Sequence, residues 1–451
     1  MRDVNIELAE RIAEAAAHYG GTAYYVGGYV RDRLRGKENK DIDIEIHGVT
    51  PAQLRDILDS TGQRLEIGKS FGVFGLRGYT LDISMPRKET NRGSGHKDFD
   101  ICVDPFIGTY GAAKRRDFTI NAMMQNVLTG EIVDHFDGKK DLESGVIRHV
   151  SADTFAEDPL RVLRAAQLAS RLGFGIADET ESLCRRMDVS ALPKERVMGE
   201  LEKAMLKSEK PSAFFEALRR MDQLSAWFPE LEALIGVQQN PRHHAEGDVW
   251  THTMMVLDVA AGYRDGAKDP LGFLLSAVTH DFGKAVCTAI VNGEIHAYNH
   301  ETAGIPLADS FMRRLTDESA LIKYVLNLTE HHMKPNVLAA DKASVKSSNK
   351  MFDRSVDPEA LIYLARADGL GKIAQREYVS YDDFFDERLK TFREYMSRPY
   401  VTGRDLIAAG LEPGEKFSEY LAFAHKLRLA GVSKEDALKQ TLAMARKDGK
   451  L

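Results

Sequence analysis

The sequence predicts an α+β fold, in which a small mixed β-sheet with helices is followed by a long body made of helices. Residues 1–150 alternate runs of β-branched and aromatic residues with stretches of helical spacing. From about Asp153 onward, apolar residues recur three and four positions apart. A chain of 451 residues is also too long for one hydrophobic core. We therefore predict four domains: a head over residues 1–150, a helical neck over 151–234, a middle domain over 235–375 and a helical tail over 376–451.

The head is expected to begin with an amphipathic helix within residues 1–21, because its apolar residues follow helical spacing. PAQLRDILDSTG predicts a second helix over residues 51–62, ending near a glycine. The runs TAYYVGG, KDIDIEIHG, GVFGLRGYTLDISM and GEIVDHF predict strands over 22–28, 40–48, 72–85 and 130–136.

The body shows helical periodicity almost throughout. Loops are expected around residues 240–246 and 333–349, where this periodicity is interrupted. Its clearest helical patterns cover residues 158–174, 195–206, 211–221 and 251–263.

The composition is that of an ordinary soluble protein, with 43% apolar and 29% charged residues. No stretch approaches the roughly 20 apolar residues that cross a bilayer, so no membrane partner is expected. Acidic residues near the start argue against a signal peptide. Cys102, Cys184 and Cys287 form no paired pattern, which favours a reducing cytoplasm.

The net charge of −7 does not by itself indicate a nucleic-acid-binding protein. Residues 426–450 are nevertheless locally basic. This segment is either a surface for nucleic acid or the solvated face of a helix.

The most informative part of the head is a glycine pair followed by two aspartates. Gly27 and Gly28 let backbone amides approach a phosphate, because glycine has no Cβ. Asp41 and Asp43 are two positions apart, which places both carboxylates on one face of a strand. Such a pair binds Mg²⁺ while leaving positions open for substrate phosphates. An exposed alternating strand is the alternative for the aspartates alone, and Asp82 is a candidate third carboxylate from a neighbouring strand.

Two further polar runs follow. In the run from Lys114 to Ala122, arginine side chains suit triphosphate oxygens, while Asp117 and Asn121 would orient the sugar or the loop. In the second run, residues 157, 158, 161 and 164 fall on one face if they are helical, with Pro159 in the first turn. Asp and Arg there would pair with a base edge, or would form a salt bridge within the helix beside an N-cap carboxylate.

These runs together resemble the class II tRNA nucleotidyltransferases, or CCA-adding enzymes, of a superfamily that includes bacterial poly(A) polymerases. GGYVRD with DID is similar to the first family motif, and KRRDFTINAM to the second. VDHFDGKKDL resembles the interdomain linker motif, EDPLRVLR the base-template motif and ERVMGELEK the fifth motif. The match extends over residues 20–205 in the family's order. The implied head is therefore a nucleotidyltransferase domain.

The resemblance implies a role for each matching residue. Asp41 and Asp43 would be catalytic and hold Mg²⁺, and Asp158 and Arg161 would read CTP and ATP. Residues 86–100 occupy the place of the flexible loop with which full CCA-adding enzymes switch from C to A. The nucleotide-binding set would comprise Gly27, Gly28, Arg31, Asp32, Arg115, Asp117, Asn121, Glu157, Asp158, Arg161 and Arg164.

A second constellation resembles the HD phosphohydrolase domain. The resemblance implies that His252, His280, Asp281 and Asp368 bind a divalent transition metal or Mg²⁺. His300 and His331 are further candidate ligands. The C-terminal segment resembles the tRNA-contacting end of HD-containing CCA-adding enzymes, with contacts made through charge rather than base readout.

The predicted function is template-independent addition of CCA to tRNA 3′ ends from CTP and ATP, with release of pyrophosphate and an accompanying HD phosphohydrolase activity. A CC-only or A-only tRNA nucleotidyltransferase and a poly(A) polymerase stay open as narrower alternatives. An HD metal-dependent phosphohydrolase with an RNA-binding head is the alternative of another class. The oligomeric state is unknown from the sequence.

Overall fold

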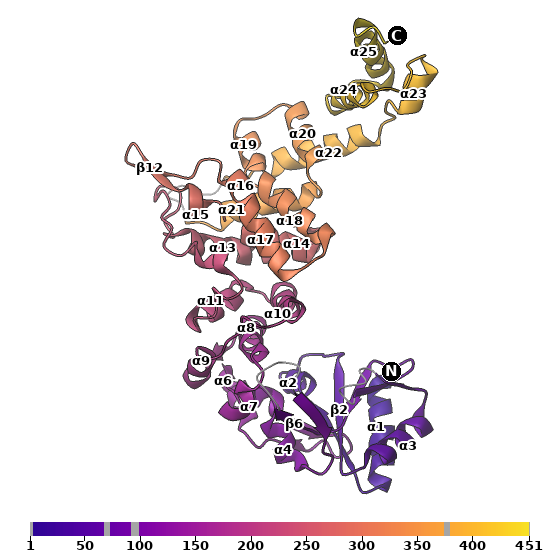
Figure 1. Ribbon diagram of the computed structural model, residues 1–451, viewed down its shortest axis with the longest axis vertical. Coiled ribbons are helices and arrows are strands. Elements are labelled where there is room, and N and C mark those ends of the chain that lie inside the picture. Colours follow the sequence, from indigo (N-terminus) through magenta and orange to yellow (C-terminus); the bar gives the residue numbers. More distant parts are fainter. Residues whose placement is uncertain (1–2, 67–72, 92–98, 374–378, 451) are drawn as a thin grey trace. The chain divides into compact units, whose positions relative to one another are not determined.

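The computed structural model describes residues 3–66, 73–91, 99–373 and 379–450. The described residues confirm the α+β fold, with a β-sheet in the head and helices through the rest of the chain (Figure 1). The chain divides into two compact units, residues 1–204 with 213–226 and residues 205–212 with 227–451. The boundaries of the four predicted domains stay a prediction.

The head is built on a seven-stranded sheet in the order β3-β4-β5-β2-β1-β8-β9. Strand β2 pairs with β1 in antiparallel orientation and with β5 in parallel orientation. The parallel register places Asp43 opposite Asp82. The strands are β1 (Thr22–Val26), β2 (Ile42–His47), β3 (Arg64–Glu66), β4 (Val73–Leu76), β5 (Leu81–Ser84), β8 (Met124–Asn126) and β9 (Ile132–Val133).

Alternation along β2 fixes which face of the sheet is polar. Ile42, Ile44 and Ile46 are buried, so the intervening side chains point to the opposite face. Helices α1 (Val4–His18) and α3 (Pro51–Thr61) pack against each other, and α1 also contacts β1 and β2. Thr50 and Gln53 form a capping box at the start of α3, which explains why this helix begins there.

Two expectations about the head need refinement. The single strand expected over residues 72–85 is an antiparallel pair, β4 and β5, with a turn at Gly78 where φ is +89°. The flexible loop expected over residues 86–100 contains paired strands β6 (Arg87–Asn91) and β7 (Phe99–Val103). The loop residues 92–98 lie outside the described residues.

The helices predicted after the sheet are present. Helices α8 (Leu160–Leu172), α10 (Lys194–Lys207) and α11 (Ser212–Arg220) match the periodic stretches of the sequence. The shorter helices of the first unit are α2 (Gly28–Leu34), α4 (Gly108–Lys114), α5 (Thr119–Ala122), α6 (Gly138–Ser144), α7 (Ala152–Ala156) and α9 (Asp178–Cys184). Strands β10 (Val146–Ile147) and β11 (Gly175–Ile176) form a small parallel pair.

The second unit is centred on helices that pack around α14 (Pro270–Thr279). Helices α13 (Val249–Ala261), α18 (Ser319–His331) and α21 (Pro358–Leu370) all contact α14. Its other elements before residue 330 are α12 (Pro229–Glu232), η1 (Arg264–Gly266), α15 (Lys284–Cys287), α16 (His300–Ala303), α17 (Ile305–Leu315) and the hairpin β12 (Ala289–Val291) with β13 (Glu294–His296).

The prediction of a loop over residues 333–349 was wrong for most of this segment. Helices α19 (Lys334–Ala340) and α20 (Val345–Arg354) occupy this segment. Pro335 lies in the first turn of α19, where a missing N–H costs no hydrogen bond, and Ser344 caps α20. Proline and serine here start helices rather than interrupt them.

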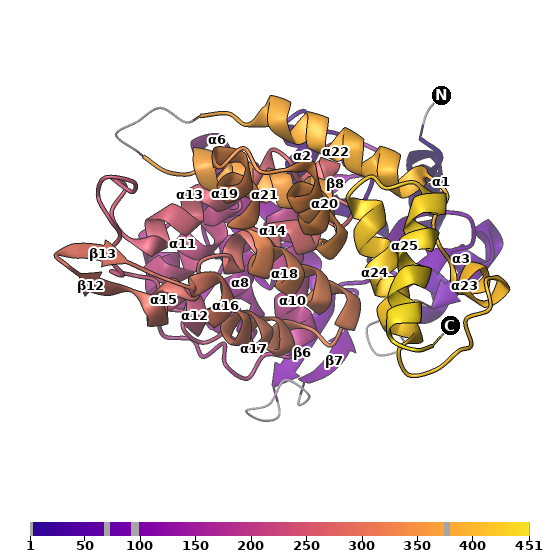
Figure 2. The same cartoon turned by 90° about the horizontal axis from the view of Figure 1, so that it is seen from above.

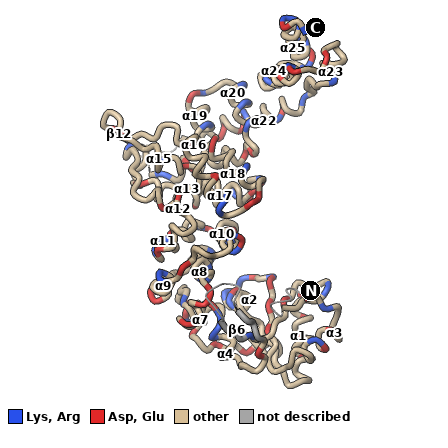
Figure 3. Tube along the Cα trace, in the orientation of Figure 1, with Lys and Arg blue, Asp and Glu red and all other residues tan. Residues whose placement is uncertain are grey.

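The C-terminal part contains α22 (Asp382–Ser397), α23 (Gly403–Ala408), α24 (Phe417–Leu429) and α25 (Lys434–Lys447). Helices α24 and α25 lie side by side (Figures 1 and 2) and share a small apolar core. Acidic and basic residues are mixed along these helices (Figure 3), and Lys434 pairs with Asp405 at 2.8 Å. Among the helices of the described residues, none combines the length and apolar character needed to cross a membrane.

Candidate functional sites

A glycine turn joins β1 to α2 in the head. Gly27 has φ 69° and ψ −139°, a conformation that residues with a Cβ disfavour. A Cβ at this position would lie 3.4 Å from Arg116 Nη1 and 3.7 Å from Asp43 Oδ2. The glycine turn, a guanidinium group and a predicted catalytic carboxylate therefore meet at one place.

Three carboxylates gather beside this turn. Asp43 and Asp82 face each other on parallel strands, and the exposed Asp41 directly precedes β2. Burial, and after it the charge of Asp82, raises the pKa of Asp43 to about 6, although Arg116 acts in the opposite direction. Ionised carboxylates this close repel each other unless a cation lies between them. Because their oxygens are the ligands that Mg²⁺ prefers, the residues fit a divalent cation.

A cavity of about 430 Å³ opens beside the carboxylates. Arg87, Arg115 and Arg116 give its wall three guanidinium groups, which suit phosphate oxygens. The described residues that line the cavity are Val26, Asp43, Glu45, Val73, Asp82, Ser84, Arg87, Ala112, Arg115 and Arg116.

Glu45 holds one of these arginines in place. Its Oε2 accepts from Arg116 Nη2 at 3.2 Å, and its Oε1 lies 2.8 Å from His47 Nε2. Burial alone would raise the pKa of Glu45, but the hydrogen bond with His47 and the charge of Arg116 lower it below the usual value. Glu45 was not predicted as a site residue, although strand alternation places it on the same face as Asp43.

Arg31 and Asp32 belong to a buried ionic network and are not among the described residues that line the cavity. Arg31 donates to both carboxylate oxygens of Asp32, at 2.8 and 2.9 Å, and to Asn121 Oδ1 at 2.7 Å. Asn121 donates to Asp117 Oδ1 at 3.1 Å. Asp117 Oδ2 accepts from Arg164 Nε at 2.8 Å and from Nη2 at 2.6 Å. The network ties α2, α5 and α8 together.

Burial would raise the pKa of Asp117, but Arg164 and the hydrogen bond from Asn121 hold it below the usual range. The Asp117 side chain is therefore an anion inside the head. Removing Arg164 would leave the Asp117 carboxylate buried without a compensating charge. The pair therefore favours the one arrangement of these side chains in which the charges stay together.

The predicted base-reading residues lie partly outside a helix. Because α8 begins at Leu160, Glu157 and Asp158 lie in the connection from α7, not on a helical face as expected. Asp158 Oδ2 accepts from Arg196 Nη2 at 3.0 Å. Arg161 donates to the backbone carbonyls of Thr154 at 2.5 Å and Arg115 at 2.9 Å.

The Glu157 side chain of this segment contacts an arginine of the cavity wall. Arg115 Nη2 lies 3.3 Å from Glu157 Oε2, and Arg115 also lines the cavity. The structure thus brings the Glu157 side chain to the edge of the phosphate-binding wall. Neither Asp158 nor Arg161 is among the described residues that line the cavity.

A second polar site lies within the second unit, where four predicted residues meet. His252 lies on α13, His280 and Asp281 directly follow α14, and Asp368 lies on α21. His252 Nε2 lies 3.4 Å from Asp281 Oδ2, 3.2 Å from Asp368 Oδ1 and 3.4 Å from His280 Nε2. Mixed imidazole and carboxylate donors of this kind fit a divalent transition metal.

Two more histidines complete what we call the His/Asp cluster, and one differs from the prediction. His300 Nε2 lies 3.2 Å from Asp281 Oδ1. The next histidine is His332, whose Nε2 lies 3.3 Å from His300 Nε2. The predicted His331 instead accepts at Nδ1 from Lys334 Nζ at 3.0 Å. Successive helical residues point about 100° apart, so His332 and not His331 faces the cluster.

The electrostatics of the cluster suit a bound cation. Burial would raise the pKa of Asp281, but Lys284 and His280 hold it well below its usual range. Burial, together with the neighbouring His280, lowers the pKa of His332 to about 3, which keeps this ring in its neutral form. Burial would lower the pKa of His252 and of His300, but hydrogen bonds with Asp368 and Asp281, respectively, raise both above the usual value, so a metal bound here would displace a proton from these two rings.

A buried carboxylate outside the cluster orients His252. Glu246 Oε1 lies 2.7 Å from His244 Nδ1 and 3.2 Å from His252 Nδ1. Its Oε2 accepts from the backbone N–H of Ile373 at 2.8 Å. A carboxylate behind a histidine fixes which nitrogen faces a metal. Glu246 was predicted only as part of a loop, because its contact with Ile373 spans more than a hundred residues and leaves no local pattern in the sequence.

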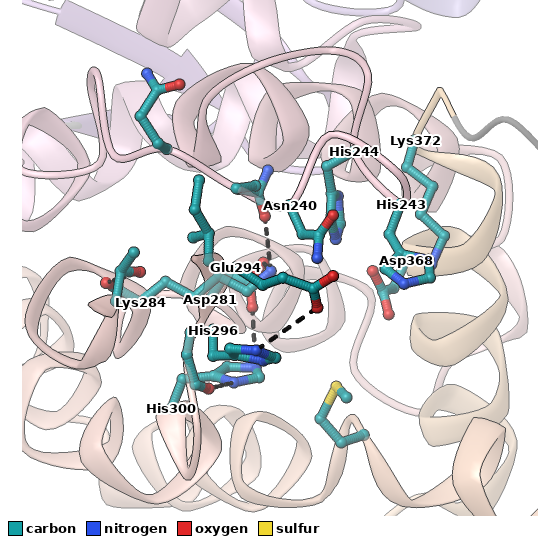
Figure 4. Close-up of a pocket in the computed structure, with 16 residues that line it drawn as sticks. Asn240, His243, His244, Asp281, Lys284, Glu294, His296, His300, Asp368 and Lys372 are labelled. Carbon is teal, nitrogen blue, oxygen red and sulfur yellow. Dashed lines mark hydrogen bonds and ion pairs between the residues drawn. The ribbon is translucent and has the colours of Figure 1, made fainter. Parts of the chain in front are cut away.

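A cavity of about 390 Å³ lies over the cluster. Asp281, His300 and Asp368 reach it, and Lys284 and Lys372 add positive charge to its wall (Figure 4). Asn240 and Glu294 also line it. The cavity therefore combines candidate metal ligands with cations that would attract a phosphate group.

Comparison with known proteins agrees with this arrangement. Residues 23–148 match the poly A polymerase head domain, and residues 173–235 match the probable RNA and SrmB-binding site of polymerase A. The head is thus that of a nucleotidyltransferase, a class of enzyme that uses divalent metal ions.

Relatives of known name show to which family of nucleotidyltransferases the chain belongs. The chain is 34% identical over 414 residues to the multifunctional CCA protein of Nitrosococcus oceani, covering 88% of this chain and 95% of the relative. It is 34% identical over 431 residues to that of Xanthomonas campestris pv. campestris, covering 92% and 99%. The protein belongs to the class II CCA-adding enzyme family.

Solved structures share the fold. A CCA-adding enzyme in complex with ATP superposes with a TM-score of 0.67 at 19% identity, covering 99% of this chain and 95% of that chain. The Thermotoga maritima CCA-adding enzyme complexed with tRNA has a TM-score of 0.63 at 20% identity, covering 98% of both chains.

Proposed function

We propose that the protein adds CCA to the 3′ ends of tRNA from CTP and ATP, without a nucleic acid template, and releases pyrophosphate. The observation that carries this proposal is the meeting of the Gly27 turn, the Asp43–Asp82 pair and the arginine-lined cavity. Membership of the CCA-adding family and the titles of the solved complexes, which name ATP, CTP and tRNA, support these substrates. The cytoplasm is the proposed location.

The reaction joins the terminal ribose hydroxyl of tRNA to the α-phosphate of the nucleotide. A new P–O bond forms, the bond between the α-phosphorus and the bridging oxygen breaks, and the hydroxyl loses its proton. Asp41 and Asp43 would hold Mg²⁺, with Asp82 as a third carboxylate beside them. When bound, Mg²⁺ supplies neutralisation of the charge that develops on the phosphates.

The chain's own groups bind and position the triphosphate. Arg115 and Arg116 donate to its oxygens from the cavity wall, and Gly27 and Gly28 permit close approach of the backbone. The network of Arg31, Asp32, Asp117, Asn121 and Arg164 positions these groups from behind.

Base selection is assigned to Asp158 and Arg161, with Glu157 and Arg164 as supporting residues. A carboxylate and a guanidinium together offer the acceptors and donors that distinguish cytosine and adenine from the other bases. The base would take up hydrogen bonds that Arg196 and the backbone carbonyls now make with these two side chains.

The tail over residues 376–451 is proposed to contact the tRNA backbone. Its basic residues, which include Lys426, Arg428, Lys439 and Lys450, would act through charge and not through base readout. Raised salt should therefore weaken tRNA binding.

A primer-extension assay tests the activity. The protein and Mg²⁺ are incubated with tRNA transcripts that lack the last one, two or three 3′ nucleotides, with CTP and ATP offered separately and together. CCA addition predicts that every transcript is completed to the same 3′ end and extended no further. A long A tail would favour a poly(A) polymerase, and extension that stops after CC would favour a CC-only enzyme.

The His/Asp cluster carries a second proposed function, hydrolysis of a phosphate ester by water. His252, His280, Asp281 and Asp368 would hold a divalent transition metal or Mg²⁺, and Lys284 and Lys372 would attract the phosphate. Release of p-nitrophenol from bis(p-nitrophenyl) phosphate tests this activity. Asp281→Asn should abolish the release, and a folded variant that retains full hydrolysis would contradict the assignment.

A further inference from the structure

We propose that a basic segment of the head, residues 33–40, binds backbone phosphates near the 3′ end of the RNA strand that is extended. This inference rests on the proposed nucleotide addition and adds a second RNA contact to the one proposed for the tail. The basic segment leads from the end of α2 to Asp41, one of the two predicted Mg²⁺ ligands.

The basic segment carries positive charge that the protein does not neutralise. It contains four basic side chains and a single acidic one. Arg33, Lys37 and Lys40 are exposed, and none of them forms an ion pair within the described part of the chain. The fourth, Arg35, lies over the ring of Phe174, 5.3 Å from its centre. Arginines elsewhere in this unit pair with carboxylates, as do Arg148, Arg164 and Arg171.

The buried Asp32 holds the basic segment in place. Its backbone carbonyl accepts from the N–H of Lys37 at 2.9 Å, and its Oδ2 accepts from Asn39 Nδ2 at 2.9 Å. Asn39 Oδ1 in turn accepts from the backbone N–H of Asp41 at 2.9 Å. The basic segment and the residue that precedes β2 are thus fixed to one buried residue. Because the backbone is already ordered, less conformational entropy is lost when Lys37 and Lys40 bind a partner.

The position of the basic segment fits the RNA strand and not the nucleotide. In an in-line displacement, the attacking hydroxyl and the departing pyrophosphate lie on opposite sides of the α-phosphorus. Arg87, Arg115 and Arg116 line the cavity beside Asp43, so the pyrophosphate would leave on that side. The described lining of this cavity includes neither Asp41 nor any residue of the basic segment. An RNA strand that approaches from the exposed Asp41 therefore brings its phosphates past the basic segment.

Lysine side chains suit such a contact. An ammonium group on a flexible stem binds a phosphate as a point charge, and phosphate contacts carry no base information. The same contact can therefore serve a strand that ends before the first C, before the second C or before the A. We expect its contribution to be equal for all three.

Steady-state kinetics on the full chain test the contact. Lys37→Gln with Lys40→Gln removes two charges and keeps the length of both side chains. Arg11→Gln with Arg55→Gln removes the same charge from exposed positions on α1 and α3, and is the matched control. Lys37→Arg with Lys40→Arg keeps the charge. The kcat and the KM values for CTP, ATP and the three shortened tRNA transcripts are measured between about 50 and 200 mM salt.

We expect the Lys37→Gln, Lys40→Gln protein to have about a 3- to 10-fold higher KM for every transcript, with kcat and the KM values for CTP and ATP unchanged. The slope of log KM for tRNA against log salt concentration should be shallower by about 1.4, because each phosphate contact with a single strand contributes about 0.7. The control and the Lys37→Arg, Lys40→Arg protein should match wild type. Circular dichroism checks folding, and the two single variants replace the double variant if it unfolds.

A transcript with neutral linkages locates the contact on the RNA. Methylphosphonates in place of the last two 3′ phosphates should raise KM in wild type and have no further effect in the Lys37→Gln, Lys40→Gln protein. Equal KM values for tRNA in these two proteins, or a higher KM for the nucleotides instead, would overturn the inference and leave nucleotide addition standing. A wild-type protein that extends no transcript would overturn the proposed function and this inference with it.

Discussion

The two polar sites balance the charge of their carboxylates in opposite ways. In the head, burial and Asp82 together raise the pKa of Asp43 to about 6, and Arg116 compensates only in part. In the His/Asp cluster, Asp281 is more deeply buried, yet Lys284 and His280 hold its pKa well below the usual range. The head therefore has more negative charge than its surroundings neutralise, whereas the cluster supplies its own partners.

This difference indicates two ways of using a metal. A partly exposed carboxylate set with few protein partners binds an ion weakly until substrate phosphates complete its coordination. Buried imidazoles oriented by backbone carbonyls form a site before any substrate arrives. We infer that the head acquires its ion with the nucleotide and that the cluster keeps its ion throughout.

The largest expected effect separates the two sites directly. Asp43→Asn should lower nucleotide addition by about 10³-fold or more, because it removes a ligand of the Mg²⁺ that would neutralise the charge developing on the phosphates. Hydrolysis of bis(p-nitrophenyl) phosphate should stay within about twofold of wild type. Primer extension and p-nitrophenol release on the same preparation measure both.

Asp59→Asn is the matched control, since Asp59 is an exposed carboxylate on α3. It should leave both activities unchanged. Loss of both activities in a folded Asp43→Asn protein would show that the sites are not independent.

The next effect concerns metal retention by the cluster. Glu246→Gln removes the negative charge behind His252 and should weaken metal binding about 10- to 100-fold, as for other carboxylates behind metal-bound histidines. Competition with a coloured chelator measures the affinity. Glu232→Gln, at an exposed position on α12, serves as the control. An unchanged metal affinity in Glu246→Gln would show that Glu246 does not support metal binding by the cluster.

The glycine turn should give a smaller effect on rate. Gly27→Ala should lower the rate of addition about tenfold, because a Cβ there meets Arg116 and Asp43 and the backbone is strained. Gly36→Ala is the control, since Gly36 also has a positive φ of +67° but has nothing within 4 Å of the added Cβ. Both variants should lose about 1 kcal/mol of stability. Equal rates in the two would mean that the Gly27 contacts do not matter for addition.

The smallest effect is on stability. The raised pKa means that the folded protein holds the Asp43 proton more tightly than the unfolded chain. Stability should therefore fall as pH rises from about 4 to about 6, and the loss persists at higher pH. In chelator at pH 7.5, Asp43→Asn should be more stable than wild type by about 1–2 kcal/mol. Denaturant unfolding measures this, and a destabilised variant would contradict the raised pKa.

Local sequence pattern was enough to predict much of the head. Alternation of isoleucine and carboxylate in β2, and glycine before α2, are signals that lie within a few residues of the site they build. The pairing of β2 with β5 is not local, and therefore Asp82 stayed only a candidate until the register placed it opposite Asp43.

The cluster was harder to predict for the same physical reason. Its ligands come from helices far apart in the sequence, and the rotation at the end of α18 decides whether His331 or His332 points inward. Glu246 acts through a contact with His252, and the spacing of apolar residues in the sequence does not indicate this contact. Helical pattern locates such helices but does not fix which end residue faces the centre.

One measurement tests the contrast between the sites most directly. Wild-type protein is gel-filtered into metal-free buffer, and both activities are assayed on the same sample before and after addition of Mg²⁺. We predict that nucleotide addition is absent until Mg²⁺ is supplied, whereas hydrolysis of bis(p-nitrophenyl) phosphate proceeds without it. Nucleotide addition in the absence of added metal would contradict the account. Loss of both activities in the metal-free buffer would contradict it as well.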